Sequence, residues 1–326
     1  MIPGTRYPTP VQLVEGLSRP GSQLWIKRDD RTHDLYGGNK VRKLDGILEQ
    51  ARDQGVKRVV TVGAAGSHHV LSTAIFGRRA GLEVEAVLVP QPRTDHVVEV
   101  LRASLGQGLR AFPVGSWAAA PFAIARRIAS GARYIPVGGS NVLGSMGYVH
   151  AARELAAQVR AGELPEPDVC VVALGSGGTA GGLAAGLEAA GMGTVVAGAC
   201  VSVPPWVLRI GSRRLAAACA IRAGIAFPSA AIRTRLTVDV RFLGAGYGHA
   251  TPEGADATRD ALEHTGLALD PTYTAKAFAC ALWHVRARRA ARVLYWHTLN
   301  SAPMAPLLTD APTEEALDPR LRALLT

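Results

Sequence analysis

Residues 169–191 read VCVVALGSGGTAGGLAAGLEAAG and decide the fold, because they hold a strand, a glycine turn and a helix in that order. The uninterrupted apolar run at 169–174 is typical of a strand buried on both faces, as in a parallel sheet. The turn GSGGT at 175–179 ends this strand and opens the segment TAGGLAAGLEAAG, for which we predict a helix. Strand, turn and helix in this order form the repeating unit of α/β proteins.

The same alternation extends along most of the chain. Further short strands are expected at 58–63, 84–89, 195–201, 236–243 and 293–297. Apolar residues recur at helical spacing over 41–51, 70–75 and 149–156. The pattern predicts an α/β fold in which helices cover parallel sheets, and a length of 326 residues favours two domains.

The composition excludes several classes of protein. With 48% hydrophobic and 19% charged residues the chain can bury a core, which argues against disorder. No apolar run reaches the about 18 residues of a membrane span, and the first residues lack the apolar stretch of a secretory signal. We therefore expect a cytoplasmic protein with no membrane partner.

The net charge of +10 raises the question of nucleic-acid binding. The basic residues are spread along the chain, and the densest stretch, 286–292, ends a predicted helix, where cations complement the helix dipole. Only 6% of the residues are aromatic, and no base-stacking motif is present. No nucleic-acid partner is expected.

The cysteines give no sign of a metal site or a disulfide. Cys170, Cys200, Cys219 and Cys280 lie far apart and form no C-x-x-C pair, so we interpret them as small buried hydrophobic residues. The adjacent pair at 68–69 does not have the i, i+4 spacing that places two histidines on one helical face. No metal site is predicted.

Four glycine-rich turns are the candidate ligand-binding segments: GGNK at 37–40, GAAGSHH at 63–69, GGSN at 138–141 and GSGGT at 175–179. In parallel sheets, ligands bind where strands end and helices begin. Glycine also serves ordinary tight turns, so a single such turn means little. Four on one chain, mostly leading into helices, favour an anion-binding site.

The GSGGT turn has the features of a phosphate-binding loop. The backbone N–H groups at a helix N-terminus are unpaired and favour negative charge, and the hydroxyls of Ser176 and Thr179 add donors. No lysine follows the last glycine as in a Walker loop, and the spacing differs from the G-x-G-x-x-G dinucleotide turn. A single small phosphate is the better prediction, with an ordinary helix start as the alternative.

Lys40 ends the GGNK turn and starts a predicted helix, where the dipole disfavours an ammonium group. A solvent-exposed lysine is the simple alternative. If the side chain is buried, its pKa falls and the amine becomes a nucleophile that can form a Schiff base. Such a lysine together with a separate phosphate-binding turn points to pyridoxal 5'-phosphate.

Ser67 follows a predicted strand and precedes the helical segment HHVLSTAIFGRRAG. Its hydroxyl can cap that helix. The same helix N-terminus can bind a carboxylate through its free N–H groups. The carboxylate of an amino-acid substrate would suit that site.

Taken together, several segments resemble one known family. LWIKRDD, GGNKVRKL, the strand–turn–Ser-His stretch at 59–69, VGGSNVLGSMGYVHAARELA, VVALGSGGT, LDPTYTAKA and VLYWHT occur in this order. They are similar to the D-cysteine desulfhydrases and 1-aminocyclopropane-1-carboxylate deaminases, which belong to the tryptophan-synthase-β-like enzymes of fold type II that use pyridoxal phosphate. The match spans roughly residues 5 to 308.

The resemblance implies two open α/β domains with parallel sheets and a cofactor cleft between them: a large domain at 1–49 and 156–326 and a small inserted one at 50–155. It also implies a role for each matching residue. Lys40 would hold the cofactor as a Schiff base, Ser176, Gly177, Gly178 and Thr179 would bind its phosphate, and Thr298 would approach the pyridine nitrogen with Thr274 nearby. Ser67, Tyr247 and Tyr273 would act in catalysis. A homodimer is also implied.

The chain departs from the family pattern at three places. The family reads Gln-Ser-Asn-His where this chain reads Gly66-Ser67-His68-His69, and Leu299-Asn300 replaces a Gly-Gly pair. His68 would take the place of an asparagine at the cofactor ring, and Ser67, His68 and His69 together would contact the substrate. Thr274 matches the desulfhydrases, since the deaminases carry glutamate there.

The resemblance therefore implies a pyridoxal phosphate-dependent lyase. The reaction expected first is β-elimination of D-cysteine or a related β-substituted amino acid, which gives pyruvate, ammonia and the leaving group. Three alternatives stay open: opening of the cyclopropane substrate, a specialised biosynthetic lyase or β-replacement enzyme, and a degenerate protein that keeps the fold and serves as a partner.

Overall fold

The computed structural model describes residues 2–202, 204–225 and 229–326. The chain divides into two compact units. The six-stranded unit consists of Gly4–Lys43 and Ser140–Ser301, and the four-stranded unit of Met1–Pro3, Leu44–Gly139 and Ala302–Thr326. Helix α1 (Asn39–Asp53) starts in the six-stranded unit and continues in the four-stranded unit.

These limits differ from the predicted domain limits at residues 1–3 and 44–49 and over two longer segments, 140–155 and 302–326. Helix α5 (Val142–Arg160) belongs to the six-stranded unit, because its apolar face packs in the same core as helix α6 (Gly178–Ala189). The C-terminal segment 302–326 belongs to the four-stranded unit. Two arginines from the 44–139 part of this unit bind the segment. Arg102 donates to the carbonyl oxygen of Pro312 at 2.6 Å, and Arg93 forms an ion pair with Glu314.

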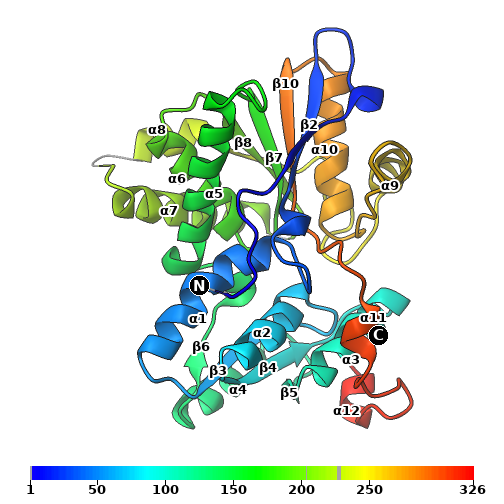
Figure 1. Cartoon of the computed structure of the whole chain (residues 1–326). Coiled ribbons are helices and arrows are strands. Elements are labelled where there is room, and N and C mark those ends of the chain that lie inside the picture. The colour runs from blue at the N-terminus through cyan, green and yellow to red at the C-terminus, as the bar shows by residue number, and fades with distance from the viewer. Residues whose placement is uncertain (1, 203, 226–228) are drawn as a thin grey trace. The chain divides into compact units, whose positions relative to one another are not determined.

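The larger sheet has the strand order β1-β2-β10-β7-β8-β9 (Figure 1). Its strands are β1 (Val11–Leu13), β2 (Gln23–Arg28), β7 (Val169–Leu174), β8 (Val195–Cys200), β9 (Leu236–Asp239) and β10 (Arg292–His297). Strand β1 pairs antiparallel with β2, and every other pairing is parallel. A parallel sheet of this kind is expected to carry helices on both faces.

Helices cover both faces of this sheet, as Figure 1 shows. Helices α5, α6, α7 (Pro205–Arg222) and α8 (Ser229–Arg235) lie on one face, and α9 (Pro252–Thr265) and α10 (Thr274–Arg286) lie on the other. Side chains alternate along each strand. Thus Leu294 and Trp296 of β10 enter the core under α5 and α6, whereas Val293 and Tyr295 enter the core under α10.

The four-stranded sheet has the order β5-β4-β3-β6 and is parallel throughout. Its strands are β3 (Arg58–Ala64), β4 (Glu83–Val89), β5 (Arg110–Pro113) and β6 (Arg133–Tyr134), joined by α2 (His68–Arg79), α3 (Asp95–Gly106) and α4 (Ala120–Ala129). The short helices α11 (Ala305–Leu308) and α12 (Pro319–Arg322) also belong to this unit. The described residues also form three 3₁₀ helices: η1 (Glu15–Leu17), η2 (Asp29–Arg31) and η3 (Val137–Gly139).

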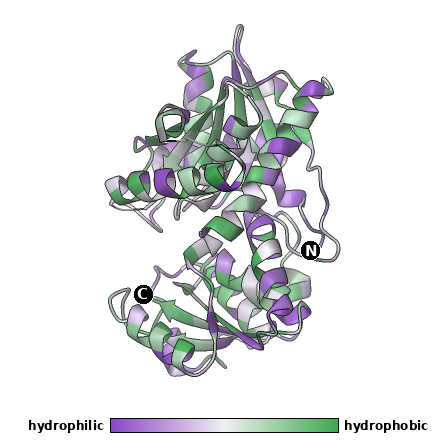
Figure 2. Cartoon of the chain, turned by 90° about the vertical axis from the view of Figure 1, so that its left-hand side faces the viewer, coloured by the Kyte–Doolittle hydropathy of each residue, from purple (hydrophilic) through white to green (hydrophobic). Residues whose placement is uncertain are grey.

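The predicted α/β architecture with parallel sheets is confirmed. Each of the six apolar runs forms a strand, and the strands of both sheets are drawn mainly in the colour of hydrophobic residues in Figure 2. Strand β9 ends at Asp239 rather than at residue 243, because the Asp239 carboxylate accepts the backbone N–H of Arg241 and so closes a turn. No helix in the described part of the chain has both the length and the apolar character to cross a bilayer.

Candidate active site

Strand order brings three of the chain's turns to one edge of the larger sheet. Strands β2, β10 and β7 are neighbours, so their carboxyl ends lie side by side. The chain reverses its direction of winding between β7 and β10, and ligands of such sheets bind at this switch point. The GGNK turn follows β2, the Thr298 turn follows β10, and the GSGGT turn follows β7.

Backbone contacts join the turn before Lys40 to the turn after β10. The N–H of Asn39 donates to the carbonyl oxygen of Thr298 at 3.1 Å, and the N–H of Gly37 donates to the side-chain oxygen of Asn300 at 2.7 Å. A Cβ atom on Gly38 would lie 2.6 Å from the Thr298 oxygen, so only glycine fits there. Asn300, one of the two residues that replace the family's glycine pair, thus holds the lysine turn.

The GSGGT turn has the geometry of an anion cradle. Gly177 adopts φ 87°, a left-handed conformation that L side chains rarely adopt, and it precedes α6. The backbone N–H of Gly178 points to the Ser140 hydroxyl at 3.2 Å, and that hydroxyl lies 2.8 Å from the hydroxyl of Ser176. Thr179 accepts a hydrogen bond from the Asn39 amide at 3.2 Å. The predicted phosphate residues therefore lie together at a helix N-terminus.

Lys43 brings a buried amine to this cradle, and the sequence analysis did not select it. Its side chain is buried, and its Nζ lies 3.1 Å from the Ser140 hydroxyl. A Cβ atom on Gly178 would lie 2.9 Å from this Nζ and 2.5 Å from the Ser140 oxygen, so only glycine leaves room for both groups at this turn. Burial first, and then the charge of Lys40, hold the pKa of Lys43 well below its usual range. An anion bound here would stabilise the charged amine.

Lys40 is half-buried by exposed area, with its amine surrounded by protein atoms. Burial lowers the pKa of Lys40 from 10.5 to about 8, and the opposing charge of Asp270 limits the shift. Roughly a tenth of the amine is then unprotonated at pH 7, far more than for an ordinary lysine, and this form is the one that a nucleophile or a general base requires. The role of Lys40 as the Schiff-base lysine stays a prediction.

Tyr247 and Tyr273 form a pair beside the glycine turn. The hydroxyl of Tyr273 donates to that of Tyr247 at 3.0 Å, and the rings meet edge to face with centroids 5.6 Å apart. A Cβ atom on Gly175 would lie 2.9 Å from the Tyr273 ring. Burial raises the pKa of both phenols, and Tyr247 raises that of Tyr273 further. Both phenols are protonated at neutral pH and can donate protons.

Thr274 forms local hydrogen bonds to Asp270 at the start of α10. Its hydroxyl donates to the Asp270 carboxylate at 2.6 Å and accepts the backbone N–H of Asp270 at 2.8 Å. The same carboxylate accepts the backbone N–H groups of Thr272 and Tyr273. Asp270 thereby fixes the tyrosine and also acts on Lys40 through its charge. A contact of Thr274 with the cofactor stays a prediction.

His297 ends β10, next to Thr298, and was not selected from the sequence. Its Nδ1 lies 3.1 Å from the Tyr295 hydroxyl, and its Nε2 is buried without a hydrogen-bond partner among the described residues. Burial lowers the pKa of His297 to about 4, so the ring is neutral at physiological pH. A buried unsatisfied nitrogen at the ligand edge of the sheet is a feature that a bound group can satisfy.

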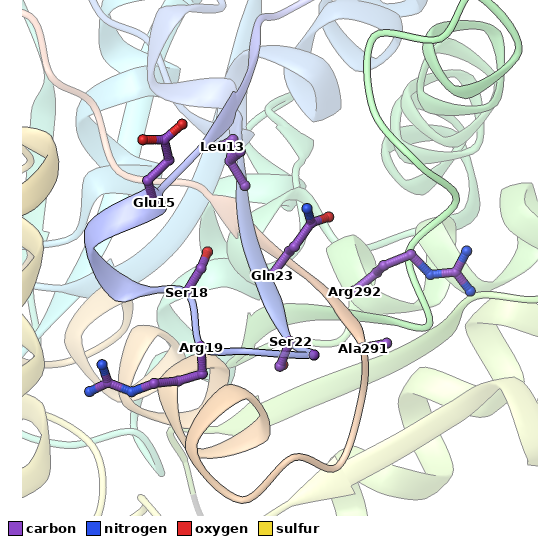
Figure 3. Close-up of a pocket in the computed structure, with 9 residues that line it drawn as sticks. Leu13, Glu15, Ser18, Arg19, Ser22, Gln23, Ala291 and Arg292 are labelled. Carbon is purple, nitrogen blue, oxygen red and sulfur yellow. The ribbon is translucent and has the colours of Figure 1, made fainter.

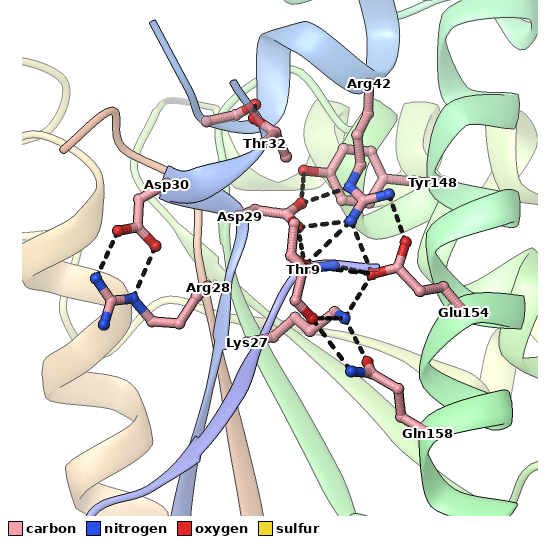
Figure 4. Close-up of polar contacts among 11 residues, drawn as sticks. Thr9, Lys27, Arg28, Asp29, Asp30, Thr32, Arg42, Tyr148, Glu154 and Gln158 are labelled. Atoms are coloured by element: carbon pink, nitrogen blue, oxygen red, sulfur yellow. Dashed lines mark hydrogen bonds and ion pairs between the residues drawn. The ribbon is translucent and has the colours of Figure 1, made fainter. Parts of the chain in front are cut away.

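A buried ion network holds Arg42 near the start of α1 (Figure 4). Lys40 and Lys43 lie two residues before it and one residue after it on the same helix. The guanidinium of Arg42 makes two hydrogen bonds to Asp29, at 2.9 and 2.8 Å, and two to Glu154, at 3.0 and 3.1 Å. Tyr148 donates to Asp29 at 2.7 Å. Bidentate pairs of this kind fix orientation as well as charge. The network therefore holds both lysines in place.

In the four-stranded unit, Ser67 caps α2: its hydroxyl accepts the N–H of Val70 across a long 3.4 Å. His69 is buried, and its Nε2 lies 2.8 Å from the hydroxyl of Thr61 on β3. This turn follows β3, next to β6, where the winding of this sheet reverses. Ser67, His68 and His69 are therefore at the ligand edge of their own sheet.

His68 faces a second histidine, which the sequence analysis did not select. The Nε2 atoms of His68 and His96 are 3.0 Å apart, and the Nδ1 of His96 lies 3.5 Å from Glu99. Gly66 makes this approach possible, because a Cβ atom there would lie 3.0 Å from the backbone of Val97 on α3. Glycine in place of the family's glutamine and histidine in place of its asparagine are thus parts of one local arrangement.

A separate pocket lies at the opposite edge of the larger sheet (Figure 3). It has a volume of about 510 Å³ and lies where β2 and β10 begin; its lining residues are Leu13, Glu15, Ser18, Arg19, Gly21, Ser22, Gln23, Ala291 and Arg292. Ligands of parallel sheets bind at the carboxyl ends of strands. The cofactor is therefore not expected in this pocket.

The residues at the carboxyl edge of the larger sheet fit pyridoxal phosphate. The glycine turn with Lys43 and three hydroxyl groups suits a phosphate dianion, because N-terminal N–H groups and a buried ammonium both favour it. Lys40 supplies an amine of lowered pKa for the aldehyde. In such a site Lys40 would hold the aldehyde, and the turn with Lys43 would hold the phosphate.

Comparison with known proteins agrees with this chemistry. The sequence profile of the family described as "Pyridoxal-phosphate dependent enzyme" matches residues 2–298. Nocardicin C-9' epimerase of Nocardia uniformis subsp. tsuyamanensis is 32% identical over 325 residues, which cover 96% of each chain. D-cysteine desulfhydrase of Salmonella paratyphi A is 34% identical over 287 residues, 83% of this chain and 84% of the relative.

Solved structures show the same fold. The crystal structure of an ACC deaminase homologue superposes with a TM-score of 0.80 at 28% identity and covers 95% of both chains. The processed form of threonine deaminase isoform 2 from Solanum lycopersicum superposes with a TM-score of 0.65 at 18% identity, over 93% of this chain and 82% of its own. The chain therefore belongs to the pyridoxal-phosphate dependent enzymes of fold type II, in the family of the D-cysteine desulfhydrases and 1-aminocyclopropane-1-carboxylate deaminases.

Proposed function

We propose that the protein is a lyase that removes the α-proton of a small amino acid and expels its β-substituent, with D-cysteine or a related β-substituted amino acid as substrate. The observation that carries the proposal is the pair of protonated phenols, Tyr247 and Tyr273, beside the turn that suits the cofactor phosphate. An elimination needs a proton donor for its leaving group as well as a base for the α-proton. The relatives named D-cysteine desulfhydrase support this choice of reaction.

Pyridoxal phosphate, when bound, supplies an electron sink for the negative charge that develops at the α-carbon. Lys40 holds the cofactor and, once its amine is free, takes the α-proton. Its pKa of about 8 suits both roles, since the optimum for a general base lies close to the working pH. Asp270 keeps this pKa from falling further.

Tyr247 donates the proton to the leaving group. Tyr273 uses its own hydrogen in the bond to the Tyr247 oxygen, so the Tyr247 hydrogen must point elsewhere. Asp270 orients Tyr273 through the backbone N–H of that residue. In this assignment Tyr247 is the acid and Tyr273 is the positioning residue.

Ser67 and the N-terminus of α2 bind the substrate carboxylate. The first N–H groups of the helix have no partner within it, and the dipole favours an anion there. His68 and His69 lie in the first turn of the same helix. In this proposal His68 contacts the substrate directly, and His69 supports the helix through its contact with Thr61.

Release of pyruvate tests the proposal. The protein loaded with cofactor is incubated with D-cysteine, L-cysteine, cysteate and D-serine, and a Lys40→Ala variant serves as the control. We expect the wild type to release pyruvate from at least one substrate and to prefer the D-enantiomer of cysteine. The variant should release none. Turnover of none of the four would refute the lyase assignment.

Epimerisation at the α-carbon is the second candidate. The relative named Nocardicin C-9' epimerase matches 96% of this chain, and the His68–His96 pair gives this chain an additional proton-transfer group. Inversion needs one group to remove the α-proton and another to return it on the opposite face. Proton exchange of an amino acid in D₂O, with inversion but without pyruvate, would favour this reaction over elimination. A His96→Gln variant should then lose inversion and keep its cofactor, and the exposed His264→Gln is a matched control.

Two other functions are distinguished by the same preparations. Opening of 1-aminocyclopropane-1-carboxylate would give 2-oxobutyrate, and Thr274→Glu is expected to raise it only if Asp270 is also neutralised, because the two carboxylates would face each other. A non-catalytic partner protein would give no turnover of any substrate. The expected homodimer and cytoplasmic location stay predictions.

A further inference from the structure

Three side chains with metal-binding atoms converge between β9 and α10 in the six-stranded unit. Cys280 and His284 are four residues apart on α10 and therefore lie on one face of the helix. Asp239 is the last residue of β9. One donor atom from each of these three residues lies within 4.8 Å of the other two, and the Cys280 thiol points to the Asp239 carboxylate at 3.3 Å.

His284 shows that the cluster is incomplete. Its Nδ1 is buried and has no hydrogen-bond partner in the part of the chain that the structure describes. Buried ring nitrogens are normally hydrogen-bonded, so such an atom needs an explanation, such as an ion that is not present. Cys280 and Asp239 are the metal-binding side chains that lie beside the His284 ring.

The neighbouring charges are compatible with a divalent ion. Arg241 contacts both carboxylate oxygens of Asp239 and stacks on the ring of Trp283, with its guanidinium 3.2 Å from the ring centroid. When the ion binds, the Cys280 thiol would lose its proton. The ion would then face two negatively charged ligands, the Cys280 thiolate and the Asp239 carboxylate. The two negative charges would balance the ion, and Arg241, which is held by Trp283, could keep one carboxylate oxygen.

We propose that Asp239, Cys280 and His284 bind one zinc-class transition-metal ion. Sulfur, imidazole nitrogen and carboxylate oxygen together match Zn²⁺, whereas Mg²⁺ and Ca²⁺ prefer oxygen ligands alone. Ligand atoms around a tetrahedral ion lie roughly 3.3–3.8 Å apart. The Cys280–Asp239 pair is already this close, and a separation near the 4.8 Å limit must shorten by about 1 Å. Three protein ligands leave the fourth position to water. The cysteine spacing by itself gave no such expectation, because the partners of Cys280 are a histidine and an aspartate.

This ion would lie on the helix that starts at Thr274, directly after Tyr273. It would join the end of β9 to the middle of α10 and stabilise the helix on which the tyrosine turn is built. The role is structural, and it does not depend on which reaction the enzyme catalyses.

Cobalt titration tests the site in the cofactor-loaded protein, purified without a polyhistidine tag. Binding of one Co²⁺ should give the intense visible bands of tetrahedral coordination and a thiolate charge-transfer band, and Zn²⁺ should abolish both. His284→Gln and Cys280→Ser should remove the charge-transfer band. Cys219→Ser, which replaces a buried cysteine on α7, is the matched control and should keep it.

Zinc should also raise the melting temperature of the wild type by mass action and leave that of His284→Gln unchanged. Because His284 is only partly buried, its substitution leaves the fold measurable even if Cys280→Ser does not fold. Absence of a cobalt–thiolate band in the wild type, or its persistence in His284→Gln, would overturn the proposal.

Discussion

The backbone N–H of Asn39 donates to the carbonyl oxygen of Thr298 across 3.1 Å. This one bond joins the turn that precedes Lys40 to the turn that follows β10, although the two are far apart in the sequence. The phosphate turn follows β7, the other neighbour of β10. The position of the lysine relative to the phosphate cradle is therefore set by the order of strands in the larger sheet.

Replacing Lys43 by methionine should weaken cofactor binding roughly 10- to 100-fold, because the phosphate loses a charged hydrogen-bond donor. Methionine fills a similar volume, so the fold should persist. Equilibrium dialysis of the cofactor measures the change, and the exposed Lys57→Met is the matched control. Equal affinity in Lys43→Met and wild type would show that Lys43 is not a phosphate ligand.

The rate of covalent cofactor loading should rise with pH through a midpoint near 8 and level off about one pH unit higher, where the Lys40 amine is mostly unprotonated. Below the midpoint the amine is mostly protonated, and the protonated form cannot attack an aldehyde. An ordinary lysine would titrate near 10.5. Stopped-flow absorbance on the cofactor-free protein, over a range of pH, gives the profile. A midpoint near 10.5 would contradict the effect of burial on this side chain.

Tyr247→Phe should lower kcat for elimination about 100-fold or more, since a positioned acid contributes roughly 10²–10⁴ in rate. Tyr273→Phe should cost less, because it removes the partner of Tyr247 and leaves the donor. Single-turnover pyruvate release compares the two variants, and the cofactor spectrum checks that both sites are intact. A larger loss of kcat in Tyr273→Phe than in Tyr247→Phe would show that Tyr273 is the acid and Tyr247 the positioning residue.

Arg42→Met should destabilise the six-stranded unit by about 3–5 kcal/mol, because Asp29 would be left buried without its partner. Urea unfolding measures this free energy. The double variant with Asp29→Asn should recover part of the loss, since the uncompensated charge is then gone. Additive losses in the two single variants would show that the pair is not coupled.

Local signals in the sequence were sufficient for several parts of this site. Turns can be identified from local residue types without knowledge of the rest of the chain. Here the signals were glycines at the ends of strands, with a lysine and a serine at the starts of helices. The strands between them were found because they are apolar on both faces. Lys40, Ser67 and the GSGGT turn were accordingly selected, and the structure places them at the ligand edges of their sheets.

Other parts depend on contacts between distant segments. Strand β2 was missed because it ends in Lys27 and Arg28, which are buried only because Glu154, Gln158 and Asp30 pair with them. The roles of Lys43 and His96 likewise depend on Ser140 and His68, each from another segment of the chain. Periodicity cannot show such pairings.

The central claim is that Lys40 carries pyridoxal phosphate and starts the chemistry. It is tested most directly by the visible absorbance spectrum of the protein, recorded before and after borohydride, beside that of Lys40→Ala. The account predicts a band that borohydride removes in the wild type, with the cofactor then fixed to Lys40 in a peptide map, and no such band in the variant. No cofactor uptake by the wild type, or fixation at another lysine, would contradict it.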